Sequence, residues 1–197
     1  MIGVNKLYTN RISSQEYLFK YPWEHYIFDD FLDDKTLKKA LNFIKKKDYK
    51  FIINKDDKQK IQYSLNFDNK LNEIFVSKWF KTFLEKITCS NVEFFEENFV
   101  QLRRMDISSP VFSKHVDIID EQKSFVIILY LTEGWQTINK GELLLYKTYR
   151  TSKKNSKIID PILNRLVILP TGKNHWHSVE KVKNFTRYSI IQEWIKK

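Results

Sequence analysis

The stretch "SFVIILYLT", residues 124–132, contains the longest apolar run of the chain, Phe125–Leu131. A membrane-spanning helix needs about 20 apolar residues, so this run is far too short to cross a membrane. Short apolar runs that are rich in β-branched residues and bounded by polar ones are typical of buried strands. The stretch therefore predicts a strand inside a β-rich fold.

Similar short runs surround this strand between residue 92 and residue 195. They are "VEFFEENFVQLRRM" (92–105), "ELLLYKTY" (142–149), "RLVILP" (165–170) and "RYSIIQEWI" (187–195), with turn residues at Pro110, Gly134, Gly141, Pro161 and Gly172. Many short strands after a helical beginning favour a sandwich or barrel over alternating βαβ units.

The first part of the chain has the spacing of amphipathic helices. In "DDKTLKKALNFIKKK" (33–47) apolar residues recur at i, i+3, i+4 and i+7, and Asp33 or Asp34 can cap the helix. A second helix is predicted from Asp68 to about Ile87. We expect an α+β, mainly β fold with a single domain over 1–197, in which residues 1–90 are mostly helical and residues 91–197 form the β-rich core.

Composition limits the classes of function. The chain of 197 residues has one cysteine, Cys89, so an intrachain disulfide or a zinc cluster of cysteines cannot form. Its N-terminus lacks the apolar core of a signal peptide, and we expect a soluble, intracellular protein of the cytoplasm. The formal net charge is +10, but the basic residues are scattered, which favours solvated surfaces over a phosphate-binding patch. Glycine-rich phosphate-binding loops of the usual nucleotide sites are absent from the sequence.

Two short histidine motifs suggest metal chemistry. "FSKHVDIID" places His115 and Asp117 two residues apart, on one face if the segment is a strand, and "KNHWHSVEKV" (173–182) does the same for His175 and His177. Two histidines and one carboxylate can bind iron and leave three coordination positions open. Periodicity does not choose between His175 and His177.

The order of these motifs and strands resembles the non-haem Fe(II)- and 2-oxoglutarate-dependent dioxygenases, and most closely their prolyl hydroxylase branch. The resemblance covers about residues 99–194. It implies a double-stranded β-helix (jelly roll) core with N-terminal support helices. It also selects His177, because His177, Val179 and Arg187 match the family's His-x-Val segment and the arginine that follows it.

The resemblance implies a role for each matched residue. His115, Asp117 and His177 would bind Fe(II), and Arg187 would bind the 5-carboxylate of 2-oxoglutarate, helped by the hydroxyl of Tyr130. The catalytic set is therefore His115, Asp117, His177 and Arg187. The cofactors implied are Fe(II), 2-oxoglutarate as cosubstrate and O2, with ascorbate as a further option.

The implied reaction is hydroxylation of an unactivated C–H bond, with succinate and CO2 as co-products. The branch points to a prolyl residue of a peptide or protein as substrate, and a small molecule stays open. The sequence departs from the family pattern at Lys140, where a glycine is common, and at Met105, where many relatives have tyrosine. Arg103 and Arg104 alternate along a strand, so one of them could face the substrate cavity.

Two other functions use the same residues differently. A nucleic-acid demethylase of the AlkB type would carry a second arginine six residues after Arg187, where this chain has Glu193, and would need a basic lid such as residues 54–63. A non-catalytic, cupin-like metal-binding module would use His175 and His177 and leave His115 and Asp117 unexplained. His175 could also line the site entrance or begin a strand as an ordinary polar residue.

Overall fold

The apolar run at residues 124–132 forms strand β8 (Ser124–Tyr130) in the computed structural model, which describes residues 3–10, 13–44, 52–53, 62–64, 69–95, 100–117 and 124–197. All seven residues of β8 are buried because both faces of the strand are covered. Phe125, Ile127 and Leu129 pack toward the helices, whereas Val126 and Ile128 pack toward a second sheet. This explains why the run is continuously apolar instead of alternating.

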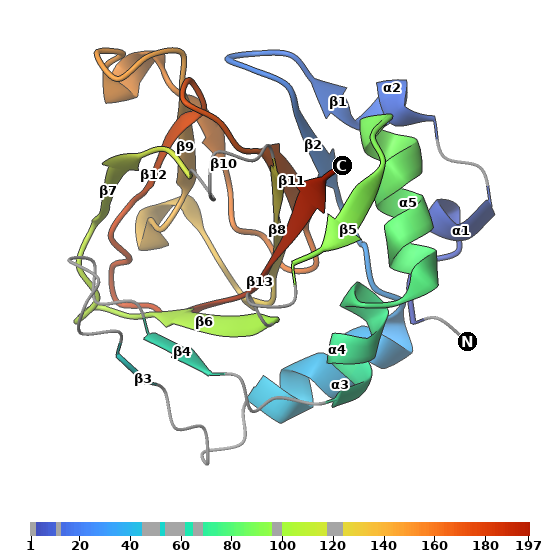
Figure 1. Cartoon of the computed structure of the whole chain (residues 1–197). Helices are drawn as coiled ribbons and strands as arrows, with labels where there is room; N and C mark the ends of the chain where they lie inside the picture. The colour runs from blue at the N-terminus through green and yellow to red at the C-terminus, as the bar shows by residue number, and fades with distance from the viewer. Residues whose placement is uncertain are drawn as a thin grey trace.

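Two antiparallel sheets form the β-rich part of the fold (Figure 1). Among the described residues the larger sheet has nine strands, in the order β1 (Leu18–Phe19), β2 (His25–Phe28), β11 (Leu166–Pro170), β8, β13 (Arg187–Lys196), β6 (Gln101–Met105), β4 (Gln62–Ser64) and β3 (Ile52–Ile53), with β5 (Val92–Phe94) paired to β13. The smaller sheet has four, β10 (Lys157–Ile159), β9 (Leu143–Tyr146), β12 (Trp176–Val179) and β7 (Phe112–His115). Side chains of both sheets share one buried cluster, which holds the sheets face to face.

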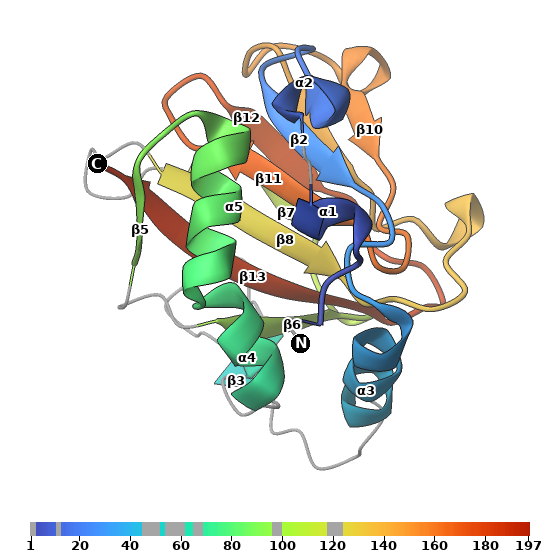
Figure 2. The same ribbon diagram turned by 90° about the vertical axis from the view of Figure 1, so that its right-hand side faces the viewer.

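Helices cover the outer face of the larger sheet (Figure 2). They are α3 (Asp34–Ile44), α4 (Asn69–Phe75) and α5 (Lys78–Thr88), with the short α1 (Leu7–Asn10) and α2 (Ser14–Tyr17) nearby and two 3-10 turns, η1 (Thr137–Asn139) and η2 (Lys153–Asn155), in the β-rich part. Phe80 of α5 packs on Trp194 of β13, with ring centroids 6.1 Å apart. The side-chain amide of Gln192 donates to the carbonyl of Phe75 at 2.7 Å, so strand and helices are also joined by a buried hydrogen bond.

The helix predictions are right in type and partly wrong in extent. Asp33 is the capping residue of α3, since its carboxylate accepts from the Thr36 amide at 2.7 Å. The helix predicted over residues 68–87 is wrong as one element. It divides into α4 and α5 because Ser77 accepts from the Phe80 amide at 3.1 Å and begins a new helix.

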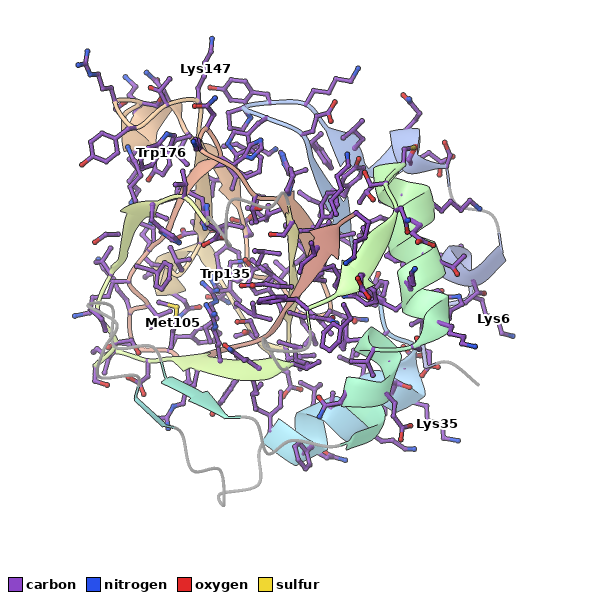
Figure 3. All side chains as sticks on the ribbon, in the orientation of Figure 1. Lys6, Lys35, Met105, Trp135, Lys147 and Trp176 are labelled. Carbon is purple, nitrogen blue, oxygen red and sulfur yellow. The ribbon has the colours of Figure 1, made fainter. Side chains whose placement is uncertain are left out.

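The mainly β class is confirmed. Lys6, Lys35 and Lys147 are exposed at separate edges of the molecule, while Met105 lies within it (Figure 3). No helix within the described ranges is long and apolar enough to cross a membrane. The proposed lid residues 54–63 lie almost wholly outside the described part of the chain.

Candidate active site

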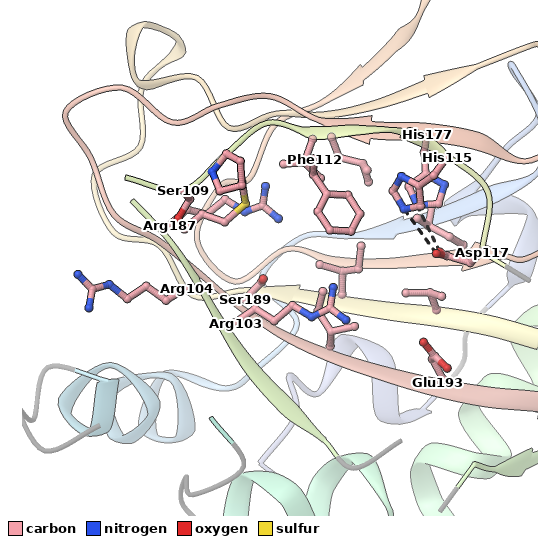
Figure 4. A pocket seen from close by; sticks show the side chains of 18 residues that line it. Arg103, Arg104, Ser109, Phe112, His115, Asp117, His177, Arg187, Ser189 and Glu193 are labelled. Carbon is pink, nitrogen blue, oxygen red and sulfur yellow. Dashed lines mark ion pairs between the residues drawn. The ribbon is translucent and has the colours of Figure 1, made fainter. Parts of the chain in front are cut away.

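A cavity of about 270 Å³ lies between the two sheets (Figure 4). Its walls are largely apolar and its polar groups gather at two places, one around two histidines and an aspartate and one around a buried arginine. The lining residues are Arg103, Arg104, Met105, Ser109, Pro110, Phe112, His115, Asp117, Val126, Ile128, Leu143, Leu169, His177, Val179, Arg187, Ser189, Ile191 and Glu193. A mostly apolar cavity with a few convergent polar groups is the usual form of a ligand site.

His115, Asp117 and His177 meet at one end of the cavity. His115 on β7 and His177 on β12 are direct cross-strand partners, with ring centroids 4.2 Å apart. The Nε2 atom of His177 lies 3.3 Å from one carboxylate oxygen of Asp117, and that of His115 lies 3.5 Å from the other. The three potential ligand atoms all lie within 4.8 Å of one another, which suits a single metal ion.

The backbone orients both imidazole rings. Nδ1 of His115 lies 2.7 Å from the Ser113 carbonyl, and Nδ1 of His177 lies 3.0 Å from the His175 carbonyl. A carbonyl can only accept, so each Nδ1 carries the proton and each Nε2 presents its lone pair to the cavity when the ring is neutral. Such outer hydrogen bonds fix metal-binding histidines in the required tautomer.

The electrostatics of the cluster also fit a cation. Burial alone would raise the pKa of Asp117, but hydrogen bonds with His115 and His177 outweigh it and hold that pKa far below its usual range. Burial would lower the pKa of His177, yet its bond to Asp117 raises that pKa above the ordinary value. The carboxylate is thus ionised and attracts positive charge, which a metal ion can supply.

His175 does not join this cluster. It precedes β12, and its ring packs edge-on against Trp23, with centroids 4.8 Å apart. Burial lowers the pKa of His175, so its neutral form is favoured. The expectation that His115 and Asp117 share one face of a strand is wrong, because β7 ends at His115 and Asp117 lies beyond its end. The two side chains converge nonetheless.

Arg187 lies at the other polar place in the cavity and is 3% exposed. Its Nη1 donates to the Gly141 carbonyl at 2.7 Å, while its Nε has no hydrogen-bond partner among the described residues. Tyr130 lies beside it, with the guanidinium carbon 5.0 Å from the ring centroid. The Tyr130 hydroxyl is buried and also lacks a described partner, and burial raises its pKa. Tyr130 is next to Arg187 but is not one of the lining residues.

The alternation of side chains along a strand determines which of the remaining polar residues face the cavity. Figure 4 shows Arg103 pointing into the cavity and Arg104 pointing away, where Arg104 pairs with Asp106 at 2.9 Å. Glu193 also faces the cavity, although the sequence did not predict it as a site residue. The signal was available, because Arg187, Ser189, Ile191 and Glu193 follow at intervals of two along one strand and must share a face.

Three comparisons with known proteins bear on this site. Residues 100–196 match the profile of the 2OG-Fe(II) oxygenase superfamily. A prolyl-4-hydroxylase from Pseudomonas putida has a similar structure, with 14% identity, TM-score 0.65 and coverage of 88% of this chain and 92% of that chain. A prolyl hydroxylase from Trichoplax adhaerens in complex with a hypoxia inducible factor peptide fragment has 16% identity, TM-score 0.63 and coverage of 87% and 83%.

A prolyl 4-hydroxylase from Phytophthora capsici gives 16% identity and TM-score 0.60, with 87% of this chain and 58% of that chain covered. No curated protein sequence matches the chain. At sequence identities of 14–16%, the structural similarity is evidence for the fold alone. It confirms the predicted jelly roll. The profile match and the cluster of two histidines and one aspartate imply Fe(II), 2-oxoglutarate and O2. Residues 100–196, which include His115, Asp117, His177 and Arg187, are therefore similar to the 2OG-Fe(II) oxygenase superfamily.

Proposed function

We propose that His115, Asp117 and His177 bind Fe(II) and that the protein hydroxylates an unactivated C–H bond with 2-oxoglutarate as cosubstrate. The observation that carries this proposal is the convergence of the three side chains on one point at the wall of the cavity between the two sheets. Two imidazoles and one carboxylate leave several coordination positions free for other ligands. Bound Fe(II), with 2-oxoglutarate and O2, supplies the oxidising power.

Arg187 binds the 5-carboxylate of 2-oxoglutarate in this proposal. A buried guanidinium without a carboxylate partner among the described residues is costly, and an anionic ligand in the cavity can compensate its charge. A planar guanidinium can donate two parallel hydrogen bonds to a carboxylate. The unpartnered hydroxyl of Tyr130 is a further donor next to Arg187.

The rest of the cavity positions the substrate and excludes water. Phe112, Val126 and Ile128 give the cavity an apolar surface, on which a saturated ring or alkyl chain can pack. A dry surrounding strengthens the interactions of Asp117 and Arg187 with charged ligands. These residues therefore place the substrate's C–H bond and keep solvent from the reacting atoms.

A prolyl residue of a peptide or protein is the proposed substrate. Its support is the likeness of the fold to three prolyl hydroxylases, one of them bound to a peptide fragment. An AlkB-type demethylase is less favoured, because Glu193 stands where that group has a second arginine. A cupin-like module is less favoured too, since His175 packs on Trp23 outside the cluster.

The test is anaerobic addition of Fe(II) and 2-oxoglutarate to the metal-free protein, recorded as the visible charge-transfer band of the complex. We expect a band in the wild type and in His175→Ala, and none in His177→Ala. His175→Ala is the matched control because it removes a neighbouring imidazole of the same segment. A wild type without a band, or a band that survives in His177→Ala, would refute the proposed ligand set. A screen of proline-containing peptides for succinate release then tests the substrate.

A further inference from the structure

The loop that joins β9 to β10 is strongly basic and has no part in the proposed binding of iron or 2-oxoglutarate. Its sequence "KTYRTSKKNSK", residues 147–157 and here called the basic loop, carries five positive charges and no negative one. These five charges equal half of the formal net charge of +10. The basic side chains that are exposed to solvent are Lys147, Arg150, Lys153 and Lys154.

The basic loop begins at the metal end of the cavity. Leu145 of β9 pairs with His177 across the smaller sheet, Tyr146 pairs with Trp176, and Lys147 follows directly where β9 ends. Lys147 and Trp176 lie in the same part of the molecule (Figure 3). Because a strand rises about 3.3 Å per residue, the loop begins roughly 7 Å along the chain from the partner of His177. A peptide that inserts one residue at the metal can therefore reach this loop with the residues that flank it.

Hydrogen bonds from neighbouring segments hold the basic loop in place. Lys114 of β7 donates to the carbonyls of Tyr149 and Thr151 at 2.8 and 2.7 Å. From the other side the hydroxyl of Tyr21 donates to the carbonyl of Asn155 at 3.0 Å. A surface that is already ordered loses little conformational entropy when it binds a partner. The positive charges of the loop are thus presented in a fixed arrangement.

These positive charges are only partly balanced within the protein. Lys153 pairs with Glu180 at 2.6 Å. Arg150 and Lys154 are exposed and form no ion pair with any residue that the structure describes. Exposed charges of one sign attract a partner of the opposite sign and direct it to the surface that carries them.

The aromatic rings at the basic loop favour an acidic peptide over a nucleic acid. Single-stranded nucleic acids bind by stacking their bases on aromatic rings, in addition to charge. Tyr149 packs against Trp176, with ring centroids 5.0 Å apart, and the ammonium of Lys114 lies 5.7 Å from the centroid of Tyr149. Because these rings already take part in contacts within the protein, the loop offers a partner mainly positive charge.

We propose that the basic loop binds acidic residues of the substrate peptide, which flank the residue that enters the cavity. Carboxylates of the peptide contact Arg150 and Lys154. An extended peptide also advances about 3.3 Å per residue, so its acidic residues lie roughly two to five positions from the hydroxylated one. This inference rests on the proposed function, because it takes a peptide that is hydroxylated at the metal to be the substrate.

The experiment compares three synthetic peptides that differ only in charge. Each has a central proline with two alanines on either side, followed outward by three glutamates, three glutamines or three lysines. Fluorescence anisotropy measures their binding to the anaerobic complex of the protein with Fe(II) and 2-oxoglutarate. We expect the glutamate peptide to bind about tenfold more tightly than the glutamine peptide at low salt, and the lysine peptide to bind most weakly. The difference should shrink as the ionic strength rises, because salt screens exposed charges.

Charge-neutral variants assign this preference to the basic loop. Arg150→Gln combined with Lys154→Gln should weaken binding of the glutamate peptide about fivefold and leave binding of the glutamine peptide unchanged. Lys35→Gln combined with Lys39→Gln is the matched control, since it removes the same charge from exposed positions of α3. Lys35 lies at the opposite end of the molecule from Lys147 (Figure 3), so this variant should bind both peptides as the wild type does.

The outcomes separate this inference from the proposed function. A wild type without the charge-transfer band refutes the proposed function, and with it the role of the peptide as substrate. A normal band with equal binding of the glutamate and glutamine peptides, with no binding of any peptide, or with the same loss in both double variants overturns the inference about the basic loop alone. A short oligothymidylate that binds more tightly than the glutamate peptide, and that is weakened by the loop variant, would assign the loop to nucleic acid and overturn the peptide inference as well.

Discussion

Arg187 shows how a single residue can be kept for a ligand at a cost to the fold. It is 3% exposed, and burial lowers its pKa, yet it pairs with no carboxylate among the described residues. Replacing an uncompensated buried charge by an apolar side chain of similar length is often stabilising. We expect Arg187→Met to raise the free energy of unfolding of the ligand-free protein by about 1–3 kcal/mol. Urea unfolding measures this.

The same substitution, Arg187→Met, should weaken the binding of 2-oxoglutarate. The loss of a bidentate charged contact in a buried site predicts an affinity roughly 100-fold lower. Titration of 2-oxoglutarate into the Fe(II) protein gives the value, and Arg104→Met, which removes an outward-pointing arginine, is the control. Lower stability together with unchanged 2-oxoglutarate affinity would show that Arg187 is a structural residue.

His25 is a buried residue with a pH-dependent role in stability. It is 0% exposed, its Nδ1 lies 2.8 Å from the Trp23 carbonyl, and its Nε2 has no hydrogen-bond partner among the described residues. Burial lowers its pKa below the ordinary 6.5, and nearby Lys157 lowers it further. Its neutral form is therefore the folded form, and the stability it contributes is complete above about pH 6.5 and declines as the pH falls toward the lowered pKa.

Replacing His25 by a residue that does not titrate should make the stability of the protein depend less on pH below neutrality. We expect the ratio of folded to unfolded wild type to fall between about pH 7.5 and about pH 5 by more than in His25→Phe, which keeps a ring beside Phe19. Urea unfolding of both proteins at the two pH values tests this, and the comparison cancels the other histidines. Equal slopes would mean that His25 does not titrate differently on folding.

The site residues differ in how far the sequence could predict them. The spacing of His115 and Asp117 suggests a metal site, whereas His177 and Arg187 are selected by the resemblance to the family, because spacing alone does not choose between His175 and His177. The choice between Arg103 and Arg104 could not be made, since alternation says that they face opposite sides without saying which side is the cavity. That choice depends on register, which long-range pairing with β13 determines.

At the scale of elements, β7 is an edge strand that carries His115 and leads to Asp117. It pairs with β12 on one side, through a register irregularity. On the outward face Lys114 donates to the carbonyls of Tyr149 and Thr151 at 2.8 and 2.7 Å, and its ammonium lies 3.9 Å from the centroid of the Tyr146 ring. Lys114 therefore ties the edge strand to the loop that follows β9.

Removing the contacts of Lys114 with this loop should reduce the affinity for the metal, although Lys114 itself does not bind the metal. We expect Lys114→Met to lower Fe(II) affinity about tenfold, in line with the effect of residues that hold metal ligands in place. Lys147→Met is the control, because Lys147 is exposed in the same loop (Figure 3). Anaerobic metal titration by competition with a chelator decides the matter. Equal affinities of the two variants would assign Lys114 to loop stability alone.

The break between α4 and α5 shows what helical periodicity cannot predict. The apolar spacing continues through residues 76 and 77, so the pattern indicates one helix. Ser77 interrupts it by donating to the Ile74 carbonyl at 2.7 Å and accepting from the Phe80 amide at 3.1 Å. Serine competes for backbone hydrogen bonds in this way at helix starts, and packing on the sheet decides whether it does so.

At the scale of the whole molecule, the two polar ends of the cavity come from different sheets. His115 and His177 belong to the smaller sheet, and Arg187 belongs to the larger one. A ligand that binds the metal at one end and Arg187 at the other links the sheets. Its binding free energy then adds to the stability of the sandwich, because it binds the folded state and not the unfolded chain.

This arrangement predicts that metal and 2-oxoglutarate stabilise the protein cooperatively. We expect Mn(II), used as an air-stable metal, to raise the free energy of unfolding by about 2.7 kcal/mol at 100 times its dissociation constant. 2-Oxoglutarate should add little by itself and clearly more once the metal is bound, since only then can it span both sheets. Thermal unfolding with neither ligand, with each alone and with both together gives the coupling, which is the stabilisation by both ligands beyond the sum of their separate effects.

Two variants test this prediction. In His177→Ala the stabilisation by metal should vanish, and in Arg187→Met the stabilisation by metal should remain while the coupling is lost. Additive effects in the wild type would mean that 2-oxoglutarate does not bridge the metal end and Arg187.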